Sequence, residues 1–481
     1  MMMQTQSPSL LGFLLMLFLL TLPSALIAYF FSGTRHFYYS TKMTSTGRDL
    51  DLIVWGATGF TGELACAYLN GNSTKIYSFD ASIPAAPANL RWAVAGRNHS
   101  MLQALNTGVE IIICEADNKA KIEEMVKRTK VIAGFAGPFI KYSDLVVEAC
   151  CKFGTHWVDI TGEVGWSRMC NDRWGDKARA TGACIVNHCG YDSIPSDLGA
   201  LFAANALLSK NQHSPIRTIT NYQQGLGGFS GGSLQTGLAK LTHPVVLSKD
   251  VDPDDLFLVG GEPSGGARKE DAYLTDSYFD KELNQWIGPF GMSSINSRVA
   301  RRSNMLLNYG AKLSYSEVQV CNNEKQANKS AKQAKNPTPP EIMIKMIESG
   351  RLPKPGEGPP PSLRKICRFQ ATLIAVNENG DDVCVTVNGG ECGYEETAKM
   401  CIESALSLIY EAASCPGIQR GGFHTPASCM GNVLINRLHR QGICFNVLAD
   451  AKGSNAKYLA RLSLAKFNEN AAKLKTLKSK M

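Results

Sequence analysis

The sequence predicts an α/β protein with a doubly wound parallel sheet, followed by a second α+β domain whose sheet is largely antiparallel. Three observations predict this. An apolar run, Leu50–Trp55, ends at the glycine-rich segment GATGFTG. Strand-like and helix-like segments then alternate up to about residue 190. Beyond that point, strand-like segments follow one another with few helices between them.

The first domain, residues 49–190, is expected to contain six parallel strands. Continuous apolar runs mark the strands, and segments with helical spacing and capping residues mark the helices between them. The expected strands are 50–55, 91–97, 109–116, 131–137, 156–163 and 183–190, and the expected helices include 63–69, 119–129 and 143–154.

Three glycines at spacings of three stand where the first strand ends and a helix begins. Glycine lets the backbone approach another group closely, and the first amides of a helix favour phosphate. An empty tight turn is the alternative, but the flanking strand and helix favour a dinucleotide site of the Rossmann type. The expected cofactor-binding residues are Gly56, Ala57, Thr58, Gly59, Phe60, Thr61 and Gly62, with Phe60 covering the site from one side.

Arg97 ends the second expected strand, where NAD sites usually carry an acidic residue. A guanidinium can bind the extra phosphate of NADP with two parallel hydrogen bonds, so the sequence favours NADPH, with NADH as the weaker alternative. An ordinary exposed arginine is the competing interpretation. Gly137 and Pro138, after the fourth strand, are expected to support the nicotinamide side, and an ordinary turn is an equal alternative.

The second domain is expected over residues 191–450. A capped helix at 190–210, a hairpin at 369–389 and a long helix at 394–414 indicate its α+β character. The lysine- and proline-rich stretch 322–361 predicts a mobile excursion or lid.

The C-terminal tail, residues 451–481, is basic. Its apolar stripe fits either an anionic membrane surface or packing on its own domain, and comprises Phe467, Ala471, Leu474 and Met481.

A hydrophobic leader precedes the first strand. Residues 1–48 include Leu10–Phe31, which is uncharged and apolar enough for a membrane-spanning helix of about 20 residues. Positive charges follow this run, so we expect a membrane-attached protein whose main body faces the cytosol. Alternatively, residues 1–42 are an extension or a cleaved leader. If translation starts at Met43, the final SKM resembles the peroxisomal address SKL and favours the peroxisome.

The composition is that of a globular protein. With 481 residues, 44% of them hydrophobic, the chain can form two or three domains with substantial cores. Much of the net charge of +8 lies in the C-terminal tail, so nucleic-acid binding is not expected. The fifteen cysteines have no ligand spacing, which predicts reduced, mostly buried thiols and no metal site.

Several segments, in order along the chain, resemble the saccharopine dehydrogenase-like oxidoreductases. They are GATGFTG (56–62), AGR (95–97), AGPF (136–139), WVDITGE (157–163), GYDSIPSDLG (190–199), RRSN (301–304), LPKPGEGP (352–359) and GGFHTPASCMG (421–431). The resemblance implies a Rossmann domain, a nicotinamide cofactor and an α/β substrate and dimerisation domain, and hence a homodimer. It is strongest to the branch associated with lipid and glycolipid metabolism, which includes trans-acting enoyl reductases.

Proton donors for the implied hydride transfer are sought at the carboxyl ends of the strands. Tyr191 and Asp192 are the expected catalytic residues, although Asp192 could instead cap a helix. The other candidates are Asp159 and Glu163, which could brace a loop, and His188.

We therefore expect an NADPH-dependent oxidoreductase that acts on a lipid-linked or apolar enoyl or carbonyl substrate. One alternative is a membrane-attached NADPH-binding scaffold without turnover. Another is an amino-acid dehydrogenase of the saccharopine type, whose dicarboxylate substrate would require clustered arginines. The one dense cluster comprises Arg298, Arg301 and Arg302, and a solvated face is its alternative.

Overall fold

The computed structural model describes residues 47–71, 87–210, 214–225, 231, 234, 238, 245–449, 453 and 455–479. Residues Arg48–Met481 form one compact unit. The apolar run Leu10–Phe31 lies outside the described residues, so the predicted membrane anchor stays a prediction. Among the helices that the structure describes, none has the length and apolar character needed to cross a membrane.

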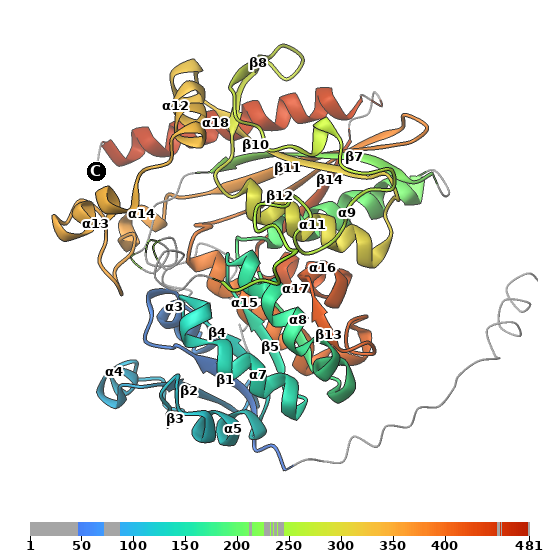
Figure 1. Cartoon of the computed structure of the whole chain (residues 1–481). Coiled ribbons are helices and arrows are strands. Elements are labelled where there is room, and N and C mark those ends of the chain that lie inside the picture. Colours follow the sequence, from blue (N-terminus) through green and yellow to red (C-terminus); the bar gives the residue numbers. More distant parts are fainter. Residues whose placement is uncertain are drawn as a thin grey trace, which may run out of the picture. The chain divides into compact units, whose positions relative to one another are not determined.

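The first sheet is fully parallel and has the strand order β13-β6-β5-β4-β1-β2-β3 (Figure 1). This confirms the predicted doubly wound sheet. The strands are β1 (Leu50–Trp55), β2 (Trp92–Gly96), β3 (Glu110–Ile113), β4 (Thr129–Gly134), β5 (His156–Asp159), β6 (Cys184–Val186) and β13 (Gly422–His424). β13 comes from the segment that the sequence assigns to the second domain, and it pairs with β6 at the sheet edge.

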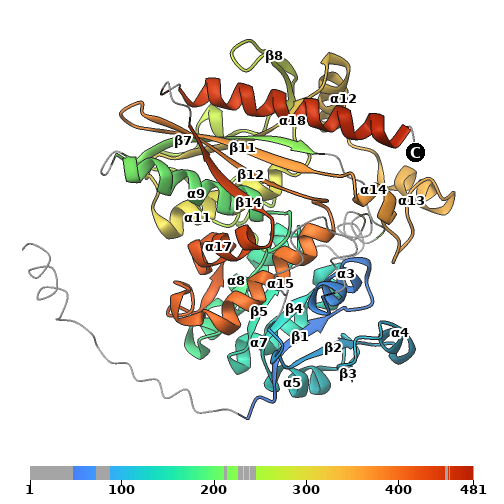
Figure 2. The same ribbon diagram turned by 180° about the vertical axis from the view of Figure 1, so that it is seen from behind.

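Helices cover both faces of this sheet because both faces of its strands are apolar. Leu52 and Val54 of β1 belong to one buried cluster, whereas Ile53 and Trp55 belong to another. Figure 2 shows α15 beside α3 over one face, and α5, α7 and α8 supply the other layer. The helices of this part are α3 (Phe60–Leu69), α4 (His99–Ala104), α5 (Lys119–Lys127), α6 (Phe139–Tyr142), α7 (Asp144–Phe153), α8 (Val164–Thr181) and α15 (Glu395–Tyr410).

The second sheet has the order β14-β12-β11-β7-β10-β9-β8 and is antiparallel except where β7 pairs with β10. This confirms the predicted largely antiparallel second sheet and its hairpin, formed by β11 and β12. Its strands are β7 (Ile216–Gly225), β8 (Tyr278–Asp280), β9 (Gln285–Pro289), β10 (Ser314–Cys321), β11 (Phe369–Asn377), β12 (Asp382–Gly389) and β14 (Cys444–Leu448).

Helices also cover both faces of the second sheet. On one face lie α9 (Ile194–Lys210) and α11 (Ser293–Leu307), and on the other lies α18 (Ala456–Ser479), drawn in red in Figure 1. α16 (Pro426–Cys429) and α17 (Asn432–Arg440) follow β13 along the chain.

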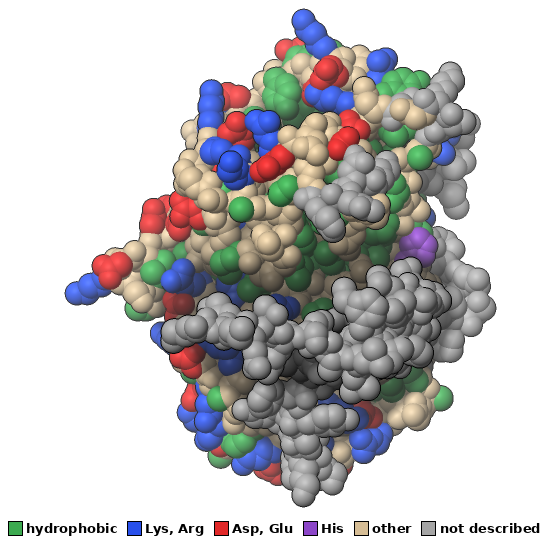
Figure 3. All heavy atoms as spheres, turned by 90° about the vertical axis from the view of Figure 1, so that its right-hand side faces the viewer, with side chains coloured by type: hydrophobic (Ala, Val, Ile, Leu, Met, Phe, Trp, Pro, Cys, Tyr) green, Lys and Arg blue, Asp and Glu red, His purple; other side chains and the backbone are tan. Residues whose placement is uncertain are grey.

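The C-terminal helix α18 packs on its own domain. Ala456, Ala460 and Leu464 are buried against the second sheet, and Phe467 and Ala471 continue the same stripe half-buried. Of the two interpretations of the tail, this contact favours packing within the domain. On the face in Figure 3, acidic and basic side chains are interspersed over the described surface, without a continuous area of one sign.

The proline- and lysine-rich stretch 322–361 contains more regular structure than its composition indicates. α12 (Glu324–Lys335) and α13 (Pro340–Glu348) form there, and α14 (Pro361–Arg364) follows. Asn323 caps α12 by accepting a hydrogen bond from the amide of Gln326. The fifteen cysteines form no disulfide, and fourteen of them are buried, which confirms the expected burial of the thiols.

Candidate functional site

The three positions of the turn after β1 are glycines for different structural reasons. A Cβ at Gly56, whose φ is +79°, would lie 2.6 Å from the backbone nitrogen of Ala136. A Cβ at Gly62 would lie 2.3 Å from the carbonyl oxygen of Gly56. At Gly59, however, the nearest described atom would be 3.4 Å away, an ordinary contact. Packing therefore requires Gly56 and Gly62, whereas Gly59 keeps the turn open.

The helix start beside this turn has amides available for a ligand. Gly59 is the N-cap of α3, and no side chain caps the helix. The amide of Glu63 donates to the carbonyl of Gly59, so the amides before it have no acceptor within the helix. Thr58 and Thr61 are half-buried at the turn, and Ala57 is buried beneath it. An open glycine, free helix amides and the positive end of a helix dipole fit a dinucleotide pyrophosphate.

Phe60 packs mainly against the second domain. Its ring meets Tyr394 edge to face, with ring centroids 5.2 Å apart, and the Arg364 guanidinium lies 5.6 Å from its centre. A Cβ at Gly358 would lie 2.3 Å from the Phe60 ring, so the chain also needs a glycine there. Phe60 thus ties the cofactor turn to the segment 358–364.

Arg97 lies at the carboxyl end of β2, directly beside the glycine turn. β1 and β2 pair in parallel, and the Gly56 amide donates to the carbonyl of Ala95. The Arg97 side chain is exposed, and no hydrogen bond or ion pair with another described residue holds its guanidinium. The role of Arg97 beside the cofactor ribose stays a prediction.

Gly137 and Pro138 lie between β4 and α6, at the same edge of the sheet. The next two amides, of Phe139 and Ile140, donate to the Glu163 carboxylate at 2.7 and 3.1 Å. Glu163 therefore braces the loop after β4, whereas the sequence suggested that it braces the loop after the fifth strand.

Asp159 is a second bracing carboxylate. It is fully buried and accepts hydrogen bonds from Trp157 Nε1 at 2.6 Å and Asn187 Nδ2 at 2.6 Å, as well as from the amides of Thr161 and His188. Burial raises its pKa to about 6 in spite of these donors. Because its oxygens are occupied, Asp159 holds the ends of β5 and β6 together.

His188 is unsuited to donate a proton. Its Nδ1 lies 2.7 Å from the carbonyl oxygen of Thr161, and its Nε2 lies 3.1 Å from Ser167 Oγ. Burial lowers its pKa to about 4, so the ring is neutral near pH 7.

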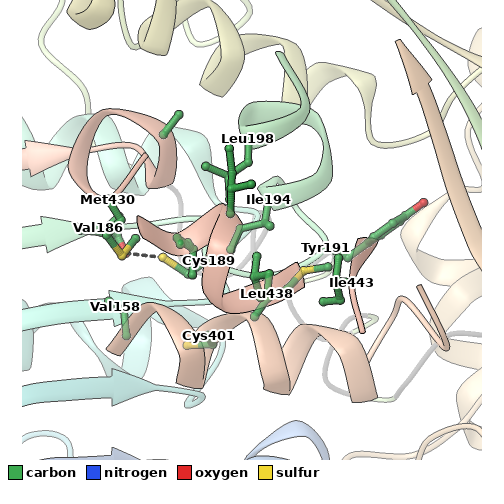
Figure 4. Close-up of a cluster of buried hydrophobic side chains, with 14 of the residues drawn as sticks. Val158, Val186, Cys189, Tyr191, Ile194, Leu198, Cys401, Met430, Leu438 and Ile443 are labelled. Carbon is green, nitrogen blue, oxygen red and sulfur yellow. Dashed lines mark hydrogen bonds between the residues drawn. The ribbon is translucent and has the colours of Figure 1, made fainter. Parts of the chain in front are cut away.

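Tyr191 is embedded in the core. Figure 4 shows its ring at one end of an apolar cluster that includes Ile194 and Ile443, and it meets Phe369 edge to face at 5.2 Å. Its hydroxyl lies 3.3 Å from Gln223 Oε1, and burial holds its pKa well above the ordinary value. Tyr191 is therefore the weaker of the two predicted catalytic residues.

Asp192 has the properties of a proton donor. Burial raises its pKa to about 7, so about half of the carboxyl groups carry a proton at neutral pH. Its buried Oδ1 has no hydrogen-bond partner among the described residues, which argues against the helix-capping alternative. Its Oδ2 lies 3.5 Å from the point where a Cβ at Gly162 would be.

Glu317 on β10 is a residue that the sequence reasoning missed. Its Oε1 accepts hydrogen bonds from Ser196, Asn221 and Gln223, and its buried Oε2 has no partner among the described residues. Burial raises its pKa to about 7, and the nearby Asp192 charge adds to the shift. The available signal was an acid in the middle of a strand-like segment, SYSEVQVC.

A cavity of about 590 Å³ has Gly162, the neighbour of Asp192, in its lining, although Asp192 itself is not among the lining residues. Its wall comes from the loop after β5, the start of α8, the segment 245–258 and α11. The lining is mainly apolar and includes Ile140, Val164, Val245, Leu247, Leu256, Leu258 and Ile295. Such a volume and lining are typical of a site for a small apolar ligand.

Two mycobacterial proteins resemble the chain over most of its length. A trans-acting enoyl reductase of Mycobacterium ulcerans is 27% identical over 430 residues, which cover 83% of this chain and 98% of that protein. A Mycobacterium tuberculosis protein provisionally given the same name is 28% identical over 437 residues, with the same coverage. No protein-family model matches the chain.

Among solved structures, saccharopine dehydrogenase (L-Glu forming) from Saccharomyces cerevisiae aligns with a TM-score of 0.46 and 11% identity, over 83% of this chain and 100% of that one. Homospermidine synthase from Legionella pneumophila, solved with NAD, aligns with a TM-score of 0.40 and 11% identity, over 83% of this chain and 90% of that one. The mycobacterial relatives confirm the resemblance predicted from the sequence and support an oxidoreductase. The chain is a homologue of the trans-acting enoyl reductases.

Proposed function

We propose that this protein is an NADPH-dependent oxidoreductase that reduces a lipid-linked or apolar substrate at an enoyl or carbonyl group. The observation that carries the proposal is the position of Gly162 between the apolar cavity and the Asp192 carboxyl. This residue lines the apolar cavity and also lies next to the buried Asp192 carboxyl, whose pKa is raised to about 7.

The chain's part in cofactor binding follows from the open turn. The amides at the start of α3 would hold the pyrophosphate, Gly59 would leave room for it, and Arg97 would pair with the 2′-phosphate. Gly137 and Pro138 would border the nicotinamide side. When bound, NADPH supplies a hydride.

Reduction of a double bond needs a proton as well as a hydride. The hydride adds to one atom of the bond and the proton adds to the other. Asp192 would deliver the proton, because burial keeps part of its carboxyl protonated at neutral pH. The bracing residues Asp159 and Glu163 would hold the two loops around it. The apolar lining would exclude water and bind the alkyl part of the substrate.

The substrate class rests on the cavity and on the relatives. Mainly apolar walls favour an alkyl chain over an amino-acid dicarboxylate. The relatives' name, trans-acting enoyl reductase, favours a carbon–carbon double bond conjugated to a carbonyl, with a simple carbonyl as the alternative.

The test is a substrate screen. Purified full-length protein is incubated with NADPH and, separately, with trans-2-enoyl thioesters of graded chain length and with alkyl aldehydes and ketones. Nicotinamide absorbance and product mass are then measured. We expect oxidation with the enoyl thioesters, lost in Asp192→Asn. NADPH binding without oxidation of any compound would overturn the enzyme assignment in favour of an NADPH-binding protein without turnover.

A further inference from the structure

The three clustered arginines of α11 have different surroundings in the structure. The sequence had left two interpretations of this cluster, a substrate site or a solvated face. Arg301 is buried, only 2% exposed, and donates to the carbonyls of Leu256, Asp271 and Tyr315. Its guanidinium carbon lies 5.0 Å from the centre of the Phe257 ring and 5.9 Å from the centre of the Tyr273 ring. Arg301 therefore fastens loops to α11, and the solvated-face interpretation does not hold for it.

Arg298 faces the cavity. It lies three residues after Ile295, so both side chains occupy one face of α11, and both line the cavity. One Arg298 nitrogen, Nη2, donates to the carbonyl oxygen of Pro253 at 3.1 Å. The buried Nε has no hydrogen-bond partner among the described residues.

Arg302 lies one helical turn beyond Arg298. It lines a smaller hollow of about 20 Å³, room for about one water molecule, next to Ser167 and His188. Its nitrogens donate to the carbonyls of Val259 and Phe423. Burial, with a smaller effect of Arg168, lowers its pKa to about 10.

Neither guanidinium forms an ion pair within the described part of the chain. Arg168, in contrast, is paired with Asp172 at 2.8 Å. The cavity lining includes two acids: Glu163 is engaged with backbone amides, and Asp254 is exposed. Arg298, partly removed from water and without a carboxylate partner among the described residues, makes the cavity wall electrostatically complementary to an anion, whereas Arg302 lines the separate hollow and lies near Asp172.

We propose that the cavity binds an amphiphilic ligand whose alkyl chain fills the apolar space and whose carboxylate or phosphate group pairs with Arg298. This proposal deepens the proposed function, because the identification of the cavity as a substrate site rests on that function. The occupant is neither a neutral lipid nor a short dicarboxylate, because the site offers one cationic end and a long apolar wall.

Binding can be measured without turnover. Full-length protein without cofactor is titrated by calorimetry with dodecanoate, dodecyl phosphate and dodecanol. We expect the two anions to bind at least about tenfold more tightly than dodecanol, because a hydrogen bond to a charged group contributes more than one to a neutral hydroxyl. Arg298→Gln should remove this preference and leave the affinity for dodecanol unchanged. Arg217→Gln, a change at an exposed arginine of β7, is the matched control and should keep the preference.

The outcomes are decisive. Equal affinity for the three ligands in the unchanged protein overturns the proposal, as does an Arg298→Gln variant that weakens dodecanol as much as the anions. A preference for dodecyl phosphate over dodecanoate indicates the phosphate of a carrier-linked acyl group, and the reverse indicates a free acid. Because no nicotinamide is present, failure here leaves the NADPH-oxidation test unaffected.

Discussion

The Asp192 carboxylate and Gly162 lie side by side, with Asp192 Oδ2 3.5 Å from the place that a Cβ on Gly162 would occupy. That place is also 3.1 Å from Ile295 Cδ1. The missing side chain lets Ile295 and the Asp192 carboxyl approach Gly162 closely, at a residue that also lines the apolar cavity near the carboxyl ends of the parallel strands.

A methyl group at Gly162 should reduce turnover without affecting the cofactor. Gly162→Ala places this group 3.5 Å from Asp192 Oδ2 and 3.1 Å from Ile295 Cδ1, at the cavity wall, so we expect a large loss of kcat/KM with enoyl thioesters and an unchanged Kd for NADPH. Gly165→Ala is the matched control, because its methyl group would meet only Val245, at an ordinary 3.7 Å. Equal losses in the two variants would contradict the role of Gly162.

The glycine turn predicts a contrast between two substitutions. Gly59→Val should abolish NADPH binding, because the branched side chain would occupy the pyrophosphate space, while the fold has room for its Cβ. Gly62→Val should instead lower the thermal midpoint, because its Cβ would collide with the Gly56 carbonyl. Calorimetric titration and thermal unfolding of both variants check this. A destabilised Gly59→Val would undermine the distinction.

Arg97 should determine the choice between the two nicotinamide cofactors. Arg97→Ala removes an exposed guanidinium beside the turn, so we expect a loss of about 1.5–3 kcal/mol in NADPH binding and little change for NADH. Kd values for both cofactors are measured with Arg217→Ala as a control. If both cofactors weaken equally, Arg97 does not bind the 2′-phosphate.

Local patterns predicted the parallel sheet and the cofactor turn, because an apolar strand, three glycines and a helix are adjacent in the sequence. Asp192 was singled out because it lies in the segment that follows β6. The cavity and Glu317 were not, because β10 and α11 reach the site only through tertiary packing. β13 was missed for the same reason: its three residues pair with β6, more than 230 positions earlier, and carry little signal of their own.

Buried carboxyls should make the stability depend on pH. Asp192 has a pKa of about 7 in the folded chain against an ordinary 3.8, so the folded state binds its proton more tightly than the unfolded state. Its contribution to stability is therefore complete below about pH 4 and is lost as the pH rises through about 7. As the pH rises through this range, the free energy of unfolding should fall less in Asp192→Asn than in the unchanged protein. Denaturant titrations at several pH values measure this difference. Parallel curves would contradict the raised pKa.

The same carboxyl should set the pH dependence of catalysis. Only the protonated form can donate, so kcat with an enoyl thioester should fall as the pH rises above about 7. Asp192→Asn keeps the size of the side chain but has no acidic proton, and we expect kcat to fall by about 10²–10⁴ and the pH-dependent decline to disappear. Asp117→Asn changes an exposed carboxylate and should keep both the rate and the profile. A purely structural Asp192 would lower kcat in the variant but leave the shape of the pH profile unchanged, and that result would exclude it as the proton donor.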